Sequence, residues 1–306
     1  MKLKNIRKSK DLSEMKVLAR TETKFNDIMI TQHGQFRDMW FVRNNEFFLQ
    51  SRIDWENPKS LVLVYSEMTL AHLLFQPEPQ RVLVVGLGGS VIPNFYRNYF
   101  PSAWIDVVDI DGKVIEIAKK YFFLRESNQL KAHEGDGRVF IQDKIGKEKY
   151  DFIVLDAFKS GSIPYHLKTA EFYEEIRSIL APGGVVSSNL YGKSNGLKPR
   201  DNVTFSNIFK QVYFFEDSEE VATVLHAAEH EQRWTREDME RSLEKITVPI
   251  PFDMREVVAM YRTGKYEAPS AKVFCDDFSG RDLLTVAERN NDNIYVERPY
   301  PIKSGS

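Results

Sequence analysis

The sequence predicts an α/β protein built on a doubly wound, mostly parallel sheet, with a small β-domain before it and a helical extension after it. Residues 15–55 alternate apolar and polar side chains in short runs broken by "QHGQ" and "RNNE", a pattern typical of antiparallel hairpins. From residue 81, continuous apolar runs alternate with helical patterns, as they do when helices bury both faces of parallel strands.

The predicted organisation has four parts. A basic tail at 1–14, beginning "MKLKNIRKSK", is expected to be a solvated arm, and an N-terminal β-hairpin domain at 15–58 follows it. The main α/β domain covers 59–230. The remaining residues, 231–306, form a helical extension and a tail whose apolar anchors indicate that it lies over the main domain.

The main domain opens with a helical period from Val62 to Leu74, which stops at "QPEPQ". Strands and helices then alternate along the chain: "RVLVVGL", "SVIPNFYRNYF", "WIDVVDID", "GKVIEIAKKYFF", "YDFIVLDAF" and "TAEFYEEIRSIL". We expect a further strand at "APGGVVSSNL" and a closing hairpin at "QVYFFED" and "EVATVLHAA". In the extension, Thr235 with Asp238 predicts a capped helix, and Asp253 predicts the cap of a second one.

Composition excludes several classes of function. Forty-two basic and forty-four acidic residues give a formal charge of −2, so no large net field attracts nucleic acid or anionic lipid. No stretch approaches the roughly 18 apolar residues of a membrane span, and the basic N-terminus lacks the apolar core of a signal peptide. The cytoplasm is therefore expected. Cys275 is the only cysteine and the six histidines are scattered, so we predict no disulfide and no metal site.

A glycine-rich loop follows the first parallel strand. Gly86, Gly88 and Gly89 would let backbone N–H groups and a helix N-terminus approach a ligand. The third glycine of the dinucleotide fingerprint is absent, because Val91 stands there, which disfavours NAD. Asp109 ends the second strand, where a carboxylate can accept hydrogen bonds from both hydroxyls of a ribose. The glycines could alternatively serve only a tight turn, and Asp109 could cap the next helix.

The stretch "EGDGRVF" favours an adenosyl ligand. Asp136 would end the third strand, where its carboxylate could bind the exocyclic amine of an adenine lying across the sheet edge. Gly137 would permit close approach of the ring. An ordinary turn aspartate is the alternative for Asp136. One adenosyl nucleoside explains Gly86, Asp109 and Asp136 together.

At this point the chain resembles the spermidine synthase (polyamine aminopropyltransferase) family, in a divergent spermidine-synthase-like branch. The likeness rests on "TKFNDIMI", "YSEMTLAHLL", "VVGLGGS", "VVDID", "EGDGRVF" and "YDFIVLDAF" in that order. The resemblance implies a Rossmann-like sheet of the class I S-adenosylmethionine-dependent methyltransferase type, and the family's usual homodimer. It also implies a set of site residues: Asn26 and Tyr65 near the donor nucleoside, Asp109 and Ile110 at the ribose, Asp136 and Gly137 at the adenine, and Asp156 facing the reacting amine.

Asp156 also makes chemical sense without the resemblance, although an aspartate at a strand end could instead cap a turn. An amine is a nucleophile only when unprotonated, so a carboxylate that accepts its proton assists transfer at neutral pH. Tyr65 is the second predicted catalytic residue. Residues 159–167 would form a lid over the acceptor. We expect His166 in that lid to pack or face solvent rather than act as a second base, and His72 to be a core residue.

The sequence departs from polyamine-forming members of that family at two positions. Gly89 stands where they carry a loop aspartate, and Lys159 stands where they carry a second aspartate in the catalytic loop. With Gly89, the loop has no carboxylate to pair with the ammonium of an aminopropyl group. With Lys159, a positive charge replaces the second aspartate and disfavours an acceptor that carries two positive charges. Asp276 and Asp277 could replace the missing carboxylates at the acceptor pocket, although a solvated turn is the favoured interpretation of this pair.

Three hypotheses of function follow. The first is transfer of an aminopropyl group from decarboxylated S-adenosylmethionine to a small-molecule amine, as in polyamine biosynthesis. The second is methyl transfer from intact S-adenosylmethionine to an amine of a small molecule or protein. The third is a non-catalytic nucleoside-binding module, which the catalytic-type aspartate at 156 disfavours.

Overall fold

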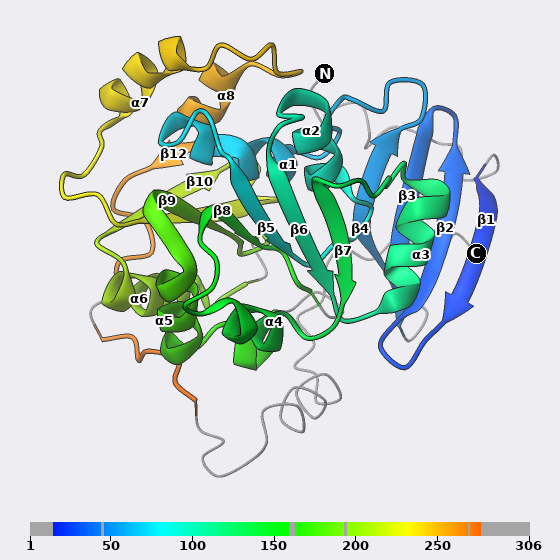
Figure 1. The fold of residues 1–306 in the computed structure, drawn as a ribbon, viewed down its shortest axis with the longest axis horizontal. Coiled ribbons are helices and arrows are strands. Elements are labelled where there is room, and N and C mark those ends of the chain that lie inside the picture. Colours follow the sequence, from blue (N-terminus) through cyan, green and yellow to red (C-terminus); the bar gives the residue numbers. More distant parts are fainter. Residues whose placement is uncertain (1–14, 44–45, 159–162, 193–194, 269, 277–306) are drawn as a thin grey trace.

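The computed structural model describes residues 15–43, 46–158, 163–192, 195–268 and 270–276. It contains a four-stranded antiparallel sheet and an eight-stranded mixed sheet with helices on both of its faces (Figure 1). The predicted α/β fold class is therefore confirmed. The predicted lid at 159–167 lies partly outside the described residues, and Lys159 is among those left out.

The N-terminal sheet is an antiparallel meander. Its order β1-β2-β3-β4 follows the chain, and each strand pairs antiparallel with the next. A bulge in β4, opposite Met39 and Trp40, shifts the register of the last pair, so that Ser51 lies opposite Met39 and Leu49 opposite Trp40. The strands are β1 (Lys16–Glu22), β2 (Asp27–His33), β3 (Phe36–Arg43) and β4 (Glu46–Asp54).

The large sheet has the order β12-β10-β11-β9-β8-β5-β6-β7. The five strands from β9 to β7 run parallel, and β11, β10 and β12 add antiparallel pairs at the other side. The strands are β5 (Arg81–Val85), β6 (Trp104–Asp109), β7 (Leu130–Glu134), β8 (Tyr150–Leu155), β9 (Leu180–Asn189), β10 (Gln211–Glu216), β11 (Thr223–Ala228) and β12 (Tyr261–Arg262).

The register of the central strands determines where the loops meet. Val85 at the end of β5 lies opposite Val108 of β6 and Leu155 of β8. The residues that follow these strands therefore leave the sheet at one edge. Gly86, Asp109 and Asp156 are consequently neighbours in space, as the strand-end argument predicted.

Side-chain capping explains the start of five of the eight α-helices that the structure describes. Asp111, Asp136, Thr169, Thr235 and Asp253 each accept a backbone N–H of the first turn, and the predicted capping box of Thr235 with Asp238 is present. The helices are α1 (Val64–Thr69), η3 (Leu70–Leu74), α2 (Val91–Tyr99), α3 (Gly112–Tyr121), α4 (Gly137–Lys144), η4 (Tyr165–Leu167), α5 (Ala170–Ile179), α6 (Lys198–Ile208), α7 (Arg236–Ser242), η5 (Leu243–Lys245) and α8 (Met254–Ala259).

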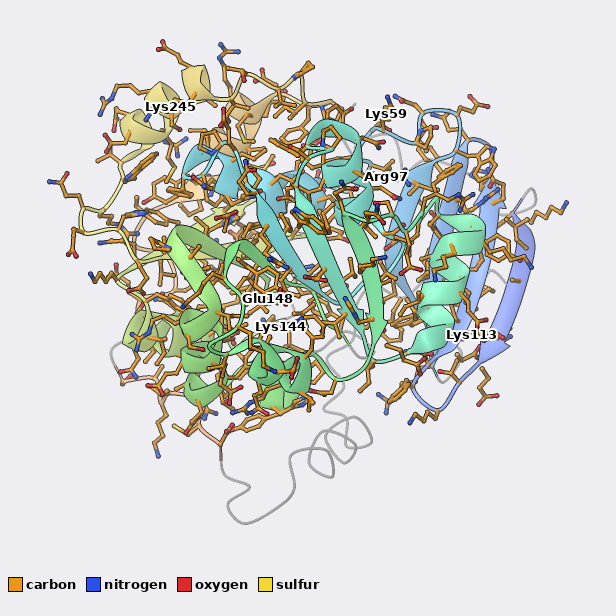
Figure 2. The ribbon with its side chains drawn as sticks, viewed as in Figure 1. Lys59, Arg97, Lys113, Lys144, Glu148 and Lys245 are labelled. Atoms are coloured by element: carbon orange, nitrogen blue, oxygen red, sulfur yellow. The ribbon has the colours of Figure 1, made fainter. Side chains whose placement is uncertain are left out.

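Two apolar layers sandwich the large sheet. Buried residues of η3, α2, α3 and α8 pack on one face together with the N-terminal sheet, and buried residues of α4, α5 and α6 pack on the other. Many charged side chains lie outside these layers: Lys113 and Lys245 project from helices at the periphery, and Lys144 pairs with Glu148 at 3.0 Å (Figure 2). No helix in the described ranges is long and apolar enough to cross a membrane.

Several elements differ from the sequence prediction, among them helix α4, which was not predicted. The helix expected over 62–74 is a short α-helix continued by the 3₁₀ helix η3. Helix α6 was not predicted, because its sequence "KPRDNVTFSNI" has few apolar residues and no clear helical period. Strand β12 extends the sheet with residues beyond the expected boundary at 230, and two residues are too few to show a strand pattern.

Asp111 joins the N-terminal sheet to the large one. Its Oδ1 accepts the N–H of Lys113 and caps α3, while its Oδ2 accepts the Thr23 hydroxyl at 2.7 Å and the Asn26 amide at 3.3 Å. The residue is buried, with 3% of its surface exposed. The loop between β1 and β2 is therefore held against the start of α3.

We expect Asp111→Ala to lower the free energy of unfolding by about 1–2 kcal/mol, because it removes a helix cap and the acceptor of the half-buried Thr23 hydroxyl and Asn26 amide. Urea unfolding measures the loss. Asp111→Asn is the matched control, since its side-chain carbonyl can still cap α3, and it should lose less than half as much. An alanine variant as stable as the native protein would show that the joint contributes nothing.

Candidate active site

A cavity of about 360 Å³ opens at the edge where the parallel strands end. Its walls come from the ends of β5, β6, β8 and β9, from the loop before β11, from the start of α1, and from β3 and β4 of the N-terminal sheet. Of the predicted site residues, the cavity brings together Asn26, Tyr65, Gly86, Gly88, Asp109, Ile110, Asp136, Gly137 and Asp156.

Gly89 is the predicted site residue that does not line the cavity. Its N–H donates to the Ser51 hydroxyl at 2.7 Å, and a Cβ on Gly89 would lie 2.6 Å from Ser51 Cβ. Gly86 has φ +95°, and its Cβ would lie 2.6 Å from the carbonyl carbon of Asp156. Gly86 is thus required where the loop crosses the end of β8, and Gly89 is required where the loop meets β4.

Asp109 accepts backbone N–H groups and does not cap a helix. Its Oδ2 accepts the N–H of Leu87 at 2.9 Å and its Oδ1 accepts that of Asp111 at 3.0 Å, while Asp111 itself caps α3. Burial raises the pKa of Asp109 to about 6, although these donors oppose the rise. The carboxylate is held rigidly beside the glycine loop, with Ile110 and Asn26 next to it in the cavity wall.

Asp136 is the N-cap of α4. Its Oδ1 accepts the N–H groups of Arg138 and Val139, and its Oδ2 contacts His166 Nε2 at 2.8 Å. Burial opposes ionisation, but the imidazole and the two N–H groups outweigh it and hold the pKa of Asp136 below its ordinary value. A Cβ on Gly137 would run into Val85, so helix packing against β5 explains this glycine without a ligand.

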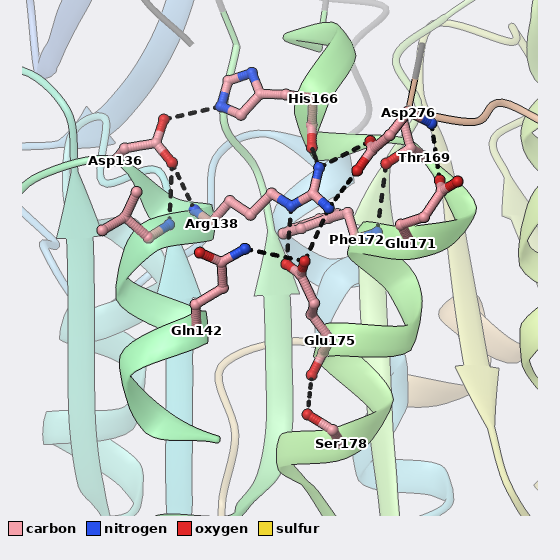
Figure 3. A network of polar contacts seen from close by, with 11 residues as sticks. Asp136, Arg138, Gln142, His166, Thr169, Glu171, Phe172, Glu175, Ser178 and Asp276 are labelled. Carbon is pink, nitrogen blue, oxygen red and sulfur yellow. Dashed lines mark hydrogen bonds and ion pairs between the residues drawn. The ribbon is translucent and has the colours of Figure 1, made fainter. Parts of the chain in front are cut away.

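His166 packs inside the protein, as expected, and 1% of its surface is exposed. Figure 3 shows the network around it. Arg138 donates to the His166 carbonyl at 3.2 Å, to Glu175 at 2.8 Å and to Asp276 at 2.6 Å. The backbone N–H of Asp276 in turn donates to Glu171. The segment near the end of the described chain therefore fixes the loop that carries His166.

The favoured interpretation of Asp276 as part of a solvated turn is wrong. Its carboxylate forms a two-pronged ion pair with Arg138, a residue with 3% of its surface exposed. Asp276 does not line the cavity, and Asp277 lies outside the described residues. The ion pair between Arg138 and Asp276 could not be predicted, because 138 positions separate the two residues along the chain.

Asp156 has the fewest hydrogen-bond donors of the cavity carboxylates. The Asn189 amide donates to its Oδ1 at 2.9 Å, and the Asn189 carbonyl oxygen accepts the N–H of Tyr191, which fixes the amide orientation. Burial raises the pKa of Asp156 to about 7, with the Asn189 amide opposing the rise. Burial and the charge of Asp156 raise the pKa of Tyr65, so this phenol is neutral.

Asn189 and Ser51 are the site residues that the sequence analysis missed. Asn189 ends β9, and its place after a buried strand in the parallel series was the available signal. Ser51 had no comparable signal, because its position depends on the bulge in β4. His72 is confirmed as a core residue: it is fully buried, contacts the Tyr96 hydroxyl at 2.8 Å and stacks on Phe152.

The charged residues of the cavity wall have one sign. Asp109, Asp136 and Asp156 line it, and no lysine or arginine does so among the residues that the structure describes. The same described part of the chain holds no group of three or more histidine, cysteine, aspartate or glutamate side chains that could bind a metal. The charge of the cavity wall accordingly favours a cationic ligand.

Comparison with known proteins agrees with this geometry. The family model described as "Spermine/spermidine synthase domain" matches residues 62–229. The chain belongs to this family. The matched range begins at α1 and ends just after β11, so it includes all the parallel strands. The resemblance found from the motifs is thereby confirmed.

Individual relatives fall into two groups. A polyamine aminopropyltransferase of Vibrio vulnificus (strain CMCP6) is 29% identical over 281 residues, which are 89% of this chain and 93% of that protein. The human (Homo sapiens) eEF1A lysine and N-terminal methyltransferase is 31% identical over 196 residues, which are 56% of this chain and 28% of that protein. A solved probable spermidine synthase from Corynebacterium glutamicum shares the fold, with a TM-score of 0.66 at 18% identity over 87% of this chain and 98% of that one.

The burial of Asp156 predicts a pH-dependent stability. The pKa of Asp156 is about 7 in the folded protein and 3.8 for an ordinary aspartate, which stands for the unfolded chain. The folded protein therefore holds this proton more tightly, and its stability falls as pH rises from about 4 to about 7. Asparagine does not titrate. We expect Asp156→Asn to be more stable than the native protein at pH 8 by about 2 kcal/mol, and to gain little at pH 4.5. Urea unfolding at the two pH values measures this difference, and an equal gain at both would contradict it.

Proposed function

We propose that this protein transfers the aminopropyl group of decarboxylated S-adenosylmethionine to a small amine. The observation that carries the proposal is the cavity lined by three carboxylates, without a lysine or arginine among its described residues. The decarboxylated donor carries a sulfonium and an ammonium, which such a wall attracts, whereas the intact donor adds a carboxylate that the wall repels. The membership in the spermine/spermidine synthase domain family supports the same choice.

The donor would lie along the glycine loop. Asp109 would accept hydrogen bonds from the ribose hydroxyls, because its carboxylate sits beside the loop at the end of β6. Asp136 and Gly137 would meet the adenine, with His166 holding the Asp136 carboxylate in place. Asn26 and Ile110 would complete the wall around the nucleoside.

The transfer step is a displacement at carbon. The acceptor nitrogen uses its lone pair to form a bond to the aminopropyl carbon attached to sulfur, and the carbon–sulfur bond breaks. Its electron pair stays on sulfur, so the sulfonium becomes a neutral thioether. The new ammonium then gives one proton to Asp156, which passes it to solvent. Tyr65, as a neutral phenol beside Asp156, would orient the amine.

Methyl transfer from intact S-adenosylmethionine is the second candidate. Ser51 fills the space beside Gly89, so the loop offers no room for the carboxylate that would pair with an aminopropyl ammonium. The similarity to the human eEF1A lysine and N-terminal methyltransferase also supports methyl transfer. A cytoplasmic location, a homodimer and the four-part domain division stay predictions.

Titration calorimetry with the two donors, in one buffer, distinguishes the candidates. We expect the decarboxylated donor to bind at least about tenfold more tightly, a difference of about 1.4 kcal/mol. Analysis of the nucleoside product then decides the reaction: methylthioadenosine marks aminopropyl transfer, and S-adenosylhomocysteine marks methyl transfer. Tighter binding of the intact donor together with the second product would overturn the proposal.

The proton acceptor makes a separate prediction. Because Asp156 must be ionised to take a proton and has a pKa of about 7, kcat/KM should rise with pH through that value and then level off. Asp156→Asn should reduce kcat by about 10²–10⁴-fold and remove this rise.

Asn189→Ala is the matched control: it removes the donor that lowers the pKa of Asp156, so the rise should move to higher pH. An unshifted profile would show that Asn189 does not act through Asp156.

A further inference from the structure

We infer that the acceptor is a monoamine whose chain beyond the reacting nitrogen is apolar, and that a diamine with a second ammonium is the poorer substrate. This inference rests on the proposed aminopropyl transfer and concerns the same cavity. It follows from the composition of one half of the cavity wall.

The strand order divides the cavity into two halves. The glycine loop, Asp109 and Asp136 follow β5, β6 and β7, on one side of β8. Asn189 ends β9 on the other side and Tyr191 follows it, and the loop before β11 lies beside them because Val224 pairs with Asn189. Asp156 at the end of β8 lies between the halves. A donor bound over the glycine loop therefore leaves the half beyond Asp156 for the acceptor.

The acceptor half is mostly apolar. Helix α1 packs against β9 and β11, which places its first residues over this half. From the elements that carry them, we assign to this half the lining residues Leu63, Val64, Tyr65, Ala157, Phe158, Asn189, Tyr191, Val221 and Ala222. Asp156 is the one carboxylate that borders it among the described lining residues. The reacting amine can meet a carboxylate there, but the far end of the acceptor meets aromatic and aliphatic groups.

Nearby acidic side chains are already occupied. The loop before β11 contains Asp217, whose two oxygens accept the N–H groups of Glu219 and Ala222. Glu220 pairs with Lys265 at 3.0 Å, and Glu216 is bonded to Lys265, Tyr266 and Thr223. None of these acids lines the cavity. Their contacts hold the loop and present Val221 and Ala222 to the acceptor.

The chemistry of burial then decides between the two acceptor classes. A second ammonium placed against these apolar groups would lose hydration without gaining a carboxylate, which is costly. A methyl group in the same place would gain from leaving water. The cavity wall therefore favours an acceptor with an amine at its reacting end and no charged group at its far end.

Two acceptors of equal length test this inference directly. Putrescine and pentan-1-amine have the same number of heavy atoms and differ in the far group, which is an ammonium in one and a methyl in the other. With decarboxylated S-adenosylmethionine as donor, we expect kcat/KM for pentan-1-amine to exceed that for putrescine at least about tenfold. Equal or better turnover of putrescine would overturn the inference and leave the proposed aminopropyl transfer intact. Turnover of neither amine would overturn both.

A substitution in the wall provides the second test. Val221→Asp adds a carboxylate to the acceptor half, and Val221→Asn, which has nearly the same shape without the charge, is the matched control. We expect the aspartate variant to raise the putrescine to pentan-1-amine ratio of kcat/KM at least about tenfold and the asparagine variant to leave it nearly unchanged. Thermal unfolding confirms that both variants fold. An equal change in the two variants, or none in the aspartate variant, would contradict the assignment of Val221 to the acceptor half.

Discussion

The register of β5 against its two neighbours is the constraint on which the site depends. Val85 lies opposite Val108 and Leu155, so the glycine loop and two carboxylates leave the sheet at one edge. These strands run parallel and are covered on both faces, which requires continuous apolar sequences. The residues that build the core therefore also set the spacing between Asp109 and Asp156.

The carboxylates at this edge are stabilised unequally, and their acidities differ accordingly. Asp136 accepts two backbone N–H groups and contacts an imidazole, and its pKa lies below the ordinary value. Asp109 accepts backbone N–H groups alone, and its pKa is about 6. Asp156 receives a side-chain amide, and its pKa is about 7. Asp136 thus keeps a fixed charge at this edge of the sheet, whereas Asp109 and Asp156 can both exchange a proton near neutral pH.

The sequence predicted the features that neighbouring residues determine. Apolar strands, capped helices and the strand-end aspartates all depend on patterns a few residues long, and these were found where expected. The partners of the carboxylates depend on tertiary contacts instead. His166 reaches Asp136 across 30 positions and Asn189 reaches Asp156 across 33, so no local pattern could identify either pair. Helix α6 was missed for a different reason, because packing rather than periodicity makes it helical.

The contact between Ser51 and Gly89 has a consequence for how this family can diverge. Ser51 and Phe122 together occupy the space that a side chain at position 89 would need, because a Cβ there would lie 2.6 Å from Ser51 Cβ and 2.9 Å from Phe122 Cδ1. An acidic residue could enter the glycine loop only after both Ser51 of β4 and Phe122 after α3 had given way. Positions 51, 89 and 122 are therefore coupled, and a larger residue in the glycine loop would require the N-terminal sheet and the segment after α3 to change with it.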